Sequence, residues 1–360
     1  MPRPISMSIA PQSRAQLLRT FETIAVGAAG GALFYWAELP GGLITGAMIA
    51  VAAVGMAGRP LGLPQPVGHA ILMTLGLSLG AMVSPQLIKN LSAYPTTIAL
   101  LALATALSTF GSALYLQRVH GWDRVSALLA GSPGALSQIV MLASERKADV
   151  PGIAVVQIMR VIILTAGVPL FLTATGMMTH GPLPSRGLAA TPLALAELAA
   201  VGFAVALLLR LVNFPASWMF GAMLGSAVLH GSGWIDGTLP QWAYIAALTG
   251  IGTLIGARFS TIRTRTILSH IGAALGSFAV AMTLSAGFVA LIAFTMPVRI
   301  GDVVVAFSPG AMDAMMALAL TLHVDPVFVG AHHLSRFIFV SLVTPGIIHL
   351  FGKGPDDLDD

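Results

Sequence analysis

Long apolar stretches set the strongest limit on how this chain of 360 residues can fold. Hydrophobic residues make up 56% of the sequence and charged residues 9%, whereas about 25% of a typical soluble protein is charged. So few polar side chains could not cover a water-facing surface, and a helix that spans a bilayer needs about 20 apolar residues. We therefore expect an all-α membrane protein with the lipid bilayer as a partner. Twelve candidate stretches lie near residues 21–37, 41–57, 67–83, 95–116, 125–143, 152–176, 189–209, 217–230, 241–256, 267–296, 303–322 and 327–351.

The same composition argues against several functional classes. The chain has no cysteine, so thiolate metal sites, iron–sulfur clusters and cysteine nucleophiles are excluded. The 18 basic residues are scattered singly between apolar stretches, unlike the basic face of a nucleic-acid-binding protein. His332 and His333 are adjacent, and neighbouring helical residues point about 100 degrees apart, which disfavours chelation of one ion. We expect no enzyme activity, no cofactor, no metal and no direct nucleic-acid partner.

An internal duplication divides the sequence. At an offset of 175 to 176 residues the glycine pairs of the third apolar stretch match those of the ninth, and the Ser-Pro-Gly-Ala segment at 132–135 matches the one at 308–311. Asp149 and Arg160 match Asp325 and Arg336 at the same offset. The match predicts a first membrane repeat at residues 15–178, a second at 189–352, and short polar tails at 1–14 and 353–360.

Loop charges favour an inverted relation between the repeats. If all twelve stretches cross the membrane, the basic loop residues divide nine to seven between its faces. If 125–143 and 303–322 instead enter and leave on one face, the division becomes thirteen to three, the strong cytoplasmic excess typical of membrane proteins. Each repeat then has five crossings, an odd number. We predict two inverted repeats of about five transmembrane helices, each with one broken or re-entrant helical hairpin, and both termini in the cytoplasm.

Ser-Pro-Gly interrupts both hairpin stretches. Proline lacks an N–H group and glycine adds backbone freedom, so a continuous helix is disfavoured there. One interpretation is a simple kink; the other is a pair of hairpins that meet near the midplane, where inverted-repeat transporters bind substrate. The second interpretation makes these residues candidates for substrate binding: Ser132, Pro133, Gly134, Ser308, Pro309 and Gly310.

Two arginines lie deep in apolar stretches. Arg160 and Arg336 each follow an aspartate by eleven residues, too far along one helix for a direct ion pair. A charge near the bilayer centre costs about 2.5 to 3.5 kcal/mol, so each arginine needs a partner from another segment or a wet cavity. One hypothesis is that they bind free carbonyls of the broken helices and hold the fold. The other is that they form an electropositive pocket for an anion such as a carboxylate.

Asp313, His332 and His333 are ionisable residues of the second repeat whose counterparts in the first repeat are not ionisable. Asp313 corresponds to Ser137, and no histidine of the first repeat corresponds to His332 or His333. A carboxylate beside the break could bind a cation, carry a proton or neutralise an arginine. We treat all three residues as candidates for ion or proton coupling.

The segments at 131–160 and 307–336, together with the duplication, resemble the AbrB family of Gram-negative membrane proteins, over residues 15–352. The resemblance implies a duplicated membrane unit. Family members have been labelled both as an ammonia monooxygenase and as regulators of gene expression, and no catalytic residues carry over to this chain. The small DNA-binding protein also called AbrB shares neither length nor composition.

These observations favour a multi-pass inner-membrane protein that acts as a secondary transporter or exporter of a small metabolite, with an anion as one candidate. The alternative is a membrane-embedded regulator of gene expression that acts indirectly or through a protein partner. The sequence does not identify the substrate and leaves a homo-oligomer open.

Overall fold

The computed structural model of the chain is built from α-helices. It describes the backbone of residues 14–82, 94–133, 139, 142–144, 146–177, 189–214 and 216–351, and this part contains no β-strand. A short 3-10 turn at Arg258–Thr261 follows one of the helices. The helices are α1 (Arg14–Trp36), α2 (Gly42–Met56), α3 (Gln65–Gly80), α5 (Tyr94–His120), α6 (Arg124–Gly131), α8 (Val150–Ala174), α9 (Pro192–Leu211), α10 (Ser217–Gly231), α11 (Gln241–Ala257), α12 (Thr264–Thr295), α13 (Ile300–Phe307), α14 (Met312–Thr321) and α15 (Pro326–Phe351).

Helix length supports the assignment to membrane proteins. Within the described residues, 7 helices are long and apolar enough to cross a bilayer: α1, α5, α8, α9, α11, α12 and α15. The helices α2 and α10 have 15 residues and α3 has 16, which is short for a span. The ten crossings expected from the sequence therefore remain a prediction for these three short helices.

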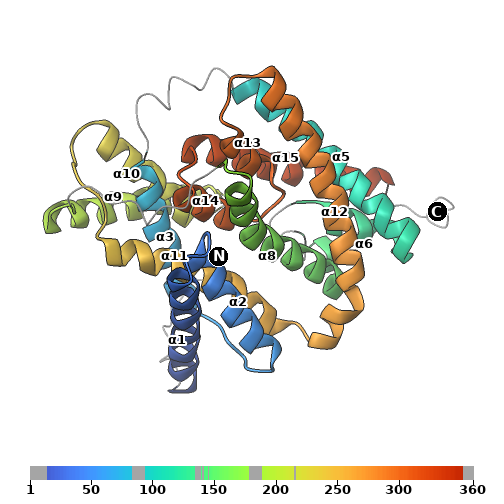
Figure 1. The fold of residues 1–360 in the computed structure, drawn as a ribbon, viewed down its shortest axis with the longest axis horizontal. Coiled ribbons are helices and arrows are strands. Elements are labelled where there is room, and N and C mark those ends of the chain that lie inside the picture. Colours follow the sequence, from blue (N-terminus) through green and yellow to red (C-terminus); the bar gives the residue numbers. More distant parts are fainter. Residues whose placement is uncertain are drawn as a thin grey trace, which may run out of the picture.

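The helices form two bundles that do not follow the repeat boundaries. The six-helix bundle comprises α1, α2, α3, α9, α10 and α11, and the hairpin bundle comprises α5, α6, α8, α12, α13, α14 and α15. In the six-helix bundle α2 packs on α11, and α3 packs on α10, so helices of one repeat lie against helices of the other. The long helices α5 and α12 run side by side in the hairpin bundle (Figure 1).

Glycines allow the close helix contacts of the six-helix bundle. A Cβ atom at Gly76 of α3 would meet the carbonyl oxygen of Met219 in α10. A Cβ atom at Gly252 of α11 would meet the carbonyl oxygen of Ile44 in α2. Ile44 and Gly252 correspond to Met219 and Gly76 in the other repeat. Small residues let helix backbones approach in this way within a membrane, where no hydrophobic effect drives helices together. These glycines therefore have a packing role in the six-helix bundle.

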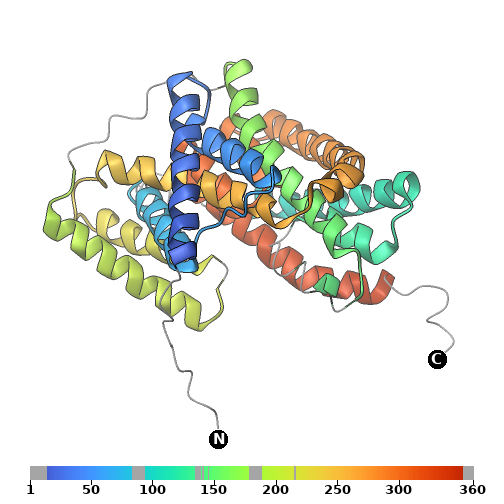
Figure 2. The ribbon, with the colours of Figure 1, turned by 90° about the horizontal axis from the view of Figure 1, so that it is seen from below.

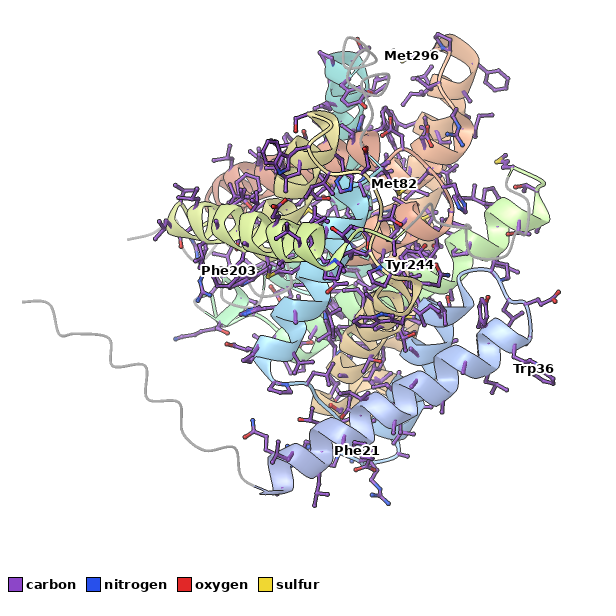
Figure 3. The ribbon with its side chains drawn as sticks, turned by 90° about the vertical axis from the view of Figure 1, so that its left-hand side faces the viewer. Phe21, Trp36, Met82, Phe203, Tyr244 and Met296 are labelled. Carbon is purple, nitrogen blue, oxygen red and sulfur yellow. The ribbon has the colours of Figure 1, made fainter. Side chains whose placement is uncertain are left out.

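Large apolar side chains cover the outside of α1 and α9. Phe21 and Trp36 of α1 point away from the body of the protein, and Phe203 lies on the outer side of α9, whereas Tyr244 is buried inside (Figure 3). Figure 2 shows α1 and α9 on the exterior of the six-helix bundle. Such a surface would be unfavourable in water and is expected where a helix faces lipid.

Candidate functional site

Both Ser-Pro-Gly segments end a helix. In the first repeat α6 stops at Gly131, and in the second α13 stops at Phe307 and α14 begins at Met312. The second segment is a true hairpin, because a guanidinium nitrogen of Arg299, before α13, donates to the carbonyl oxygen of His323, after α14, at 3.4 Å. A simple kink would carry these two residues to opposite ends of the bundle.

Matching hydrogen bonds close the base of each hairpin. The backbone N–H of Asp149 donates to Ser126 Oγ at 2.9 Å, and the N–H of Asp325 donates to Asp302 Oδ1 at 3.0 Å. Both bonds join residues 23 positions apart, and the two pairs correspond at the repeat offset of 176. In each repeat the chain therefore returns to the level at which it entered the hairpin.

The two hairpin bases lie at different ends of α5. Tyr94, at the start of α5, donates its hydroxyl hydrogen to Asp325 Oδ2 at 3.4 Å, beside the second base. The first base begins just after α5 ends at His120, and a helix of 27 residues is about 40 Å long. The corresponding contact at the first base joins His270 Nε2 of α12 to Asp149 Oδ2 at 3.2 Å. Each long helix thus contacts the hairpin base of the other repeat.

The buried arginines bind the carbonyl groups where the helices break. Arg160 Nη2 donates to Ala130 O at 2.8 Å, and Arg336 Nη2 donates to Ala306 O at 2.8 Å. Arg336 Nη1 also donates to Ser308 O at 2.6 Å. The last carbonyls of a helix have no partner within it and carry partial negative charge, so a guanidinium satisfies them well. The hydrogen bonds that the first hypothesis expects are therefore present, and they leave other N–H groups of both arginines for a ligand.

His333 takes the structural place of a glutamine. In the first repeat Gln157 Nε2 donates to Leu129 O at 3.1 Å and to Ser132 O at 2.7 Å. His333 occupies the corresponding position, and its Nε2 lies 3.1 Å from Val305 O, the equivalent of the leucine carbonyl. A carbonyl only accepts, so Nε2 carries the hydrogen. Burial and this bond explain a structural role for His333. A role in proton coupling remains a prediction.

His332 joins α15 to α5. Its Nδ1 lies 2.7 Å from Phe328 O and therefore donates, while its Nε2 lies 2.8 Å from Thr97 Oγ1. The imidazole is fully buried and packs on the Phe328 ring, with centroids 4.0 Å apart. These contacts fix the ring one helical turn before Arg336 on α15. The ring nitrogens of His332 and His333 bond to different groups and do not converge on one ion site.

A small cavity lies where the two breaks come together, with room for a group about the size of a water molecule. Arg336 supplies the one charged side chain among its lining residues. Ser108 Oγ and Arg336 Nε are buried there without a hydrogen-bond partner in the part of the chain that the structure describes. The cavity is lined by Leu101, Ala104, Thr105, Ser108, Pro133, Ser285, Phe307, Pro309 and Arg336.

The remaining candidates occupy different positions. Asp313, in the first turn of α14, is absent from the cavity lining and lies 3.9 Å from Arg258 Nη2, at the end of α11. Gly310 is partly buried beside Met315, and Gly134 lies outside the described residues. No group of three or more metal-binding side chains occurs among the residues described.

Sequence reasoning missed the hydroxyl groups of the cavity. Thr105 and Ser108 come from α5 and Ser285 from α12, and none was singled out beforehand. A signal was present: Thr105, Ser108 and Ser112 recur at helical spacing within an apolar helix, so they share one face. In a membrane helix such a face usually points to a neighbouring helix or a cavity.

Comparison with known proteins identifies the family. The family model described as "Transition state regulatory protein AbrB" matches residues 43–352. The chain is 27% identical to "Uncharacterized protein YhjN" of Bacillus subtilis, over 94% of this chain and 96% of that protein. It is 26% identical to "Putative regulator AbrB" of Escherichia coli, over 87% and 91%.

No solved structure matches. The expected family itself is confirmed, because the matched region covers most of the sequence and includes both helix breaks. The chain belongs to the AbrB family.

Proposed function

We propose that this protein is a secondary transporter or exporter of a small metabolite, built from two inverted repeats in the inner membrane. The observation that carries the proposal is the cavity between the two helix breaks, which both prolines and Arg336 line. Broken backbone at membrane depth persists where it lines a cavity or is buried in protein, and transporters use such breaks to bind substrate at the midplane.

The hairpin bases support the inverted arrangement. They lie at different ends of α5, about 40 Å apart along the helix, and the breaks meet between them. Two hairpins that enter from opposite faces of a bilayer would have this geometry. A duplication in which both copies had the same orientation would bring both bases to one face.

The two bundles provide a route to alternating access. The cavity lies wholly within the hairpin bundle, which contacts the six-helix bundle mainly through α14 against α3 and α11 and through α8 against α2. Among the described residues, the side-chain hydrogen bonds that cross this boundary include Tyr244 to Leu320 O and Thr45 to Thr165 O, both at 3.4 Å. A shift of the hairpin bundle against the other would carry the cavity with it.

A membrane-embedded regulator is the second candidate, because the relative in Escherichia coli carries the name of a regulator. No described helix pair forms a separate domain outside the apolar bundles, so this role would act through a partner or a transported metabolite. Regulatory effects that survive variants lacking transport, together with a co-purifying cytoplasmic protein, would favour it.

Two experiments test the transporter proposal. Single cysteines at Ala148 and Gly187 in the cysteine-free chain should be labelled from opposite sides of intact cells; labelling from one side would refute the inverted repeats. Metabolite profiling of a deletion strain should then identify a solute for flux measurements in proteoliposomes, with Arg336→Ala and Asp313→Asn compared with the parent. Unchanged flux in both variants would remove these residues from the mechanism.

A further inference from the structure

The geometry points to a specific ligand chemistry for the cavity between the helix breaks: the carboxylate group of a small organic acid that carries a single negative charge. This inference rests on the proposed transport function and deepens it. We infer that Ser108 and Arg336 bind the carboxylate oxygens, and that the apolar lining accepts a short hydrocarbon part. Ser108 then becomes a ligand-contacting residue of α5.

Charge balance gives the sign of the ligand. Arg336 is 3% exposed, and the cavity lining contains no acidic residue. The ion pairs of the described residues do not involve Arg336, whose hydrogen bonds go to neutral carbonyl groups. An unbalanced buried cation is costly, so a ligand with one negative charge is favoured over a neutral one.

The free donors indicate a carboxylate. Arg336 donates one hydrogen from Nη1 to Ser308 O and one from Nη2 to Ala306 O, and its Nε–H has no partner among the described residues. Ser108 is 2% exposed. Its Oγ also has no hydrogen-bond partner among the residues that the structure describes. Two separate donors suit the two oxygens of one carboxylate. Arg336 is the one cation in the cavity lining, so a single carboxylate balances the charge there.

The remaining lining limits the size and polarity of the ligand. Leu101, Ala104 and Phe307 are apolar, and the two prolines have no N–H to donate. The space in this structure admits only a small group, so the charged head must be compact. The space has room for about one water molecule, so the breaks must move apart to admit even a small carboxylate, and a sugar or an amino acid would need a much larger opening.

The test uses the purified full-length protein and three probes at equal ionic strength: propionate, its uncharged isostere propionamide, and succinate. Equilibrium binding and thermal unfolding should detect propionate binding and weaker or no binding of the other two. Ser108→Ala should weaken propionate binding about tenfold, because it removes a hydrogen bond to a charged group. Ser78→Ala is the matched control, since Ser78 is another buried serine without a described partner and lies in the six-helix bundle.

Each alternative outcome overturns the inference. Tighter binding of succinate would refute the single charge, and equal binding of propionamide would refute the need for any charge. Equal effects of Ser108→Ala and Ser78→Ala would refute the assigned contact. If no probe binds while the reconstituted protein transports another class of solute, the inference fails and the transporter proposal stands; if no solute is transported, the proposed function fails.

Discussion

The ion pair between Arg258 and Asp313 should hold the two bundles in the arrangement observed. It joins α11 of the six-helix bundle to α14 of the hairpin bundle, with Nη2 and Oδ2 3.9 Å apart. At the repeat offset of 176, the first repeat has Met82 and Ser137 at these positions, which cannot form an ion pair. If the bundles shift as proposed and the repeats exchange conformations, the pair has no counterpart, so it favours one position.

The magnitude follows from distance and exposure. Two unit charges at this separation attract by about 4 kcal/mol at an effective dielectric constant of about 20. The side chains are 33% and 25% exposed, so water and salt reduce the net contribution to about 1 kcal/mol. Such a contribution changes the ratio of the two positions about fivefold. Arg258→Gln and Asp313→Asn should each produce this change, and the double variant should do no more than either single variant.

Pulsed electron paramagnetic resonance, which measures the distance between two spin labels, can test the prediction. Spin labels on cysteines at Trp36 and Phe294, which are 83% and 90% exposed and lie on different bundles, should report two distances whose populations shift. The chain has no native cysteine to interfere. The charge-swapped variant Arg258→Asp with Asp313→Arg should recover much of the original ratio. Fully additive effects of the two single variants would refute the reasoning, because additivity means no coupling between the side chains.

Three further predictions concern the fold. His333→Gln should keep the free energy of unfolding, measured in detergent, near that of the parent. His333→Leu should lower it by about 1 to 3 kcal/mol because Val305 O loses its partner. Gly76→Val should cost about 1 to 3 kcal/mol or more against the backbone of α10, while Gly167→Val, where a Cβ meets nothing within 4 Å, should cost much less. Asp302→Ala should speed hydrogen exchange of the amide that begins the turn into α15, and unchanged exchange would contradict the role of this side chain in closing the hairpin.

The positions of the helix breaks could be predicted from the sequence because their cause is local. Ser-Pro-Gly removes a backbone donor and adds freedom within a few residues, whatever surrounds it, and α6 and α13 end at these segments. The helical class could be predicted for a similar reason, since composition determines it. The need of Arg160 and Arg336 for partners from another segment also followed from the cost of buried charge.

The amino-acid sequence by itself determined a membrane-embedded helical protein, its duplication, the two helix breaks and the burial of two arginines. Only the tertiary structure decided which groups the arginines bind, that helices of the two repeats mix within each bundle, that Asp313 lies beside Arg258, and that Ser108 lines the cavity. The physical reason is how far apart in sequence the interacting residues lie. Breaks and helices depend on neighbouring residues, whereas these contacts join residues far apart in sequence and depend on how complete helices pack.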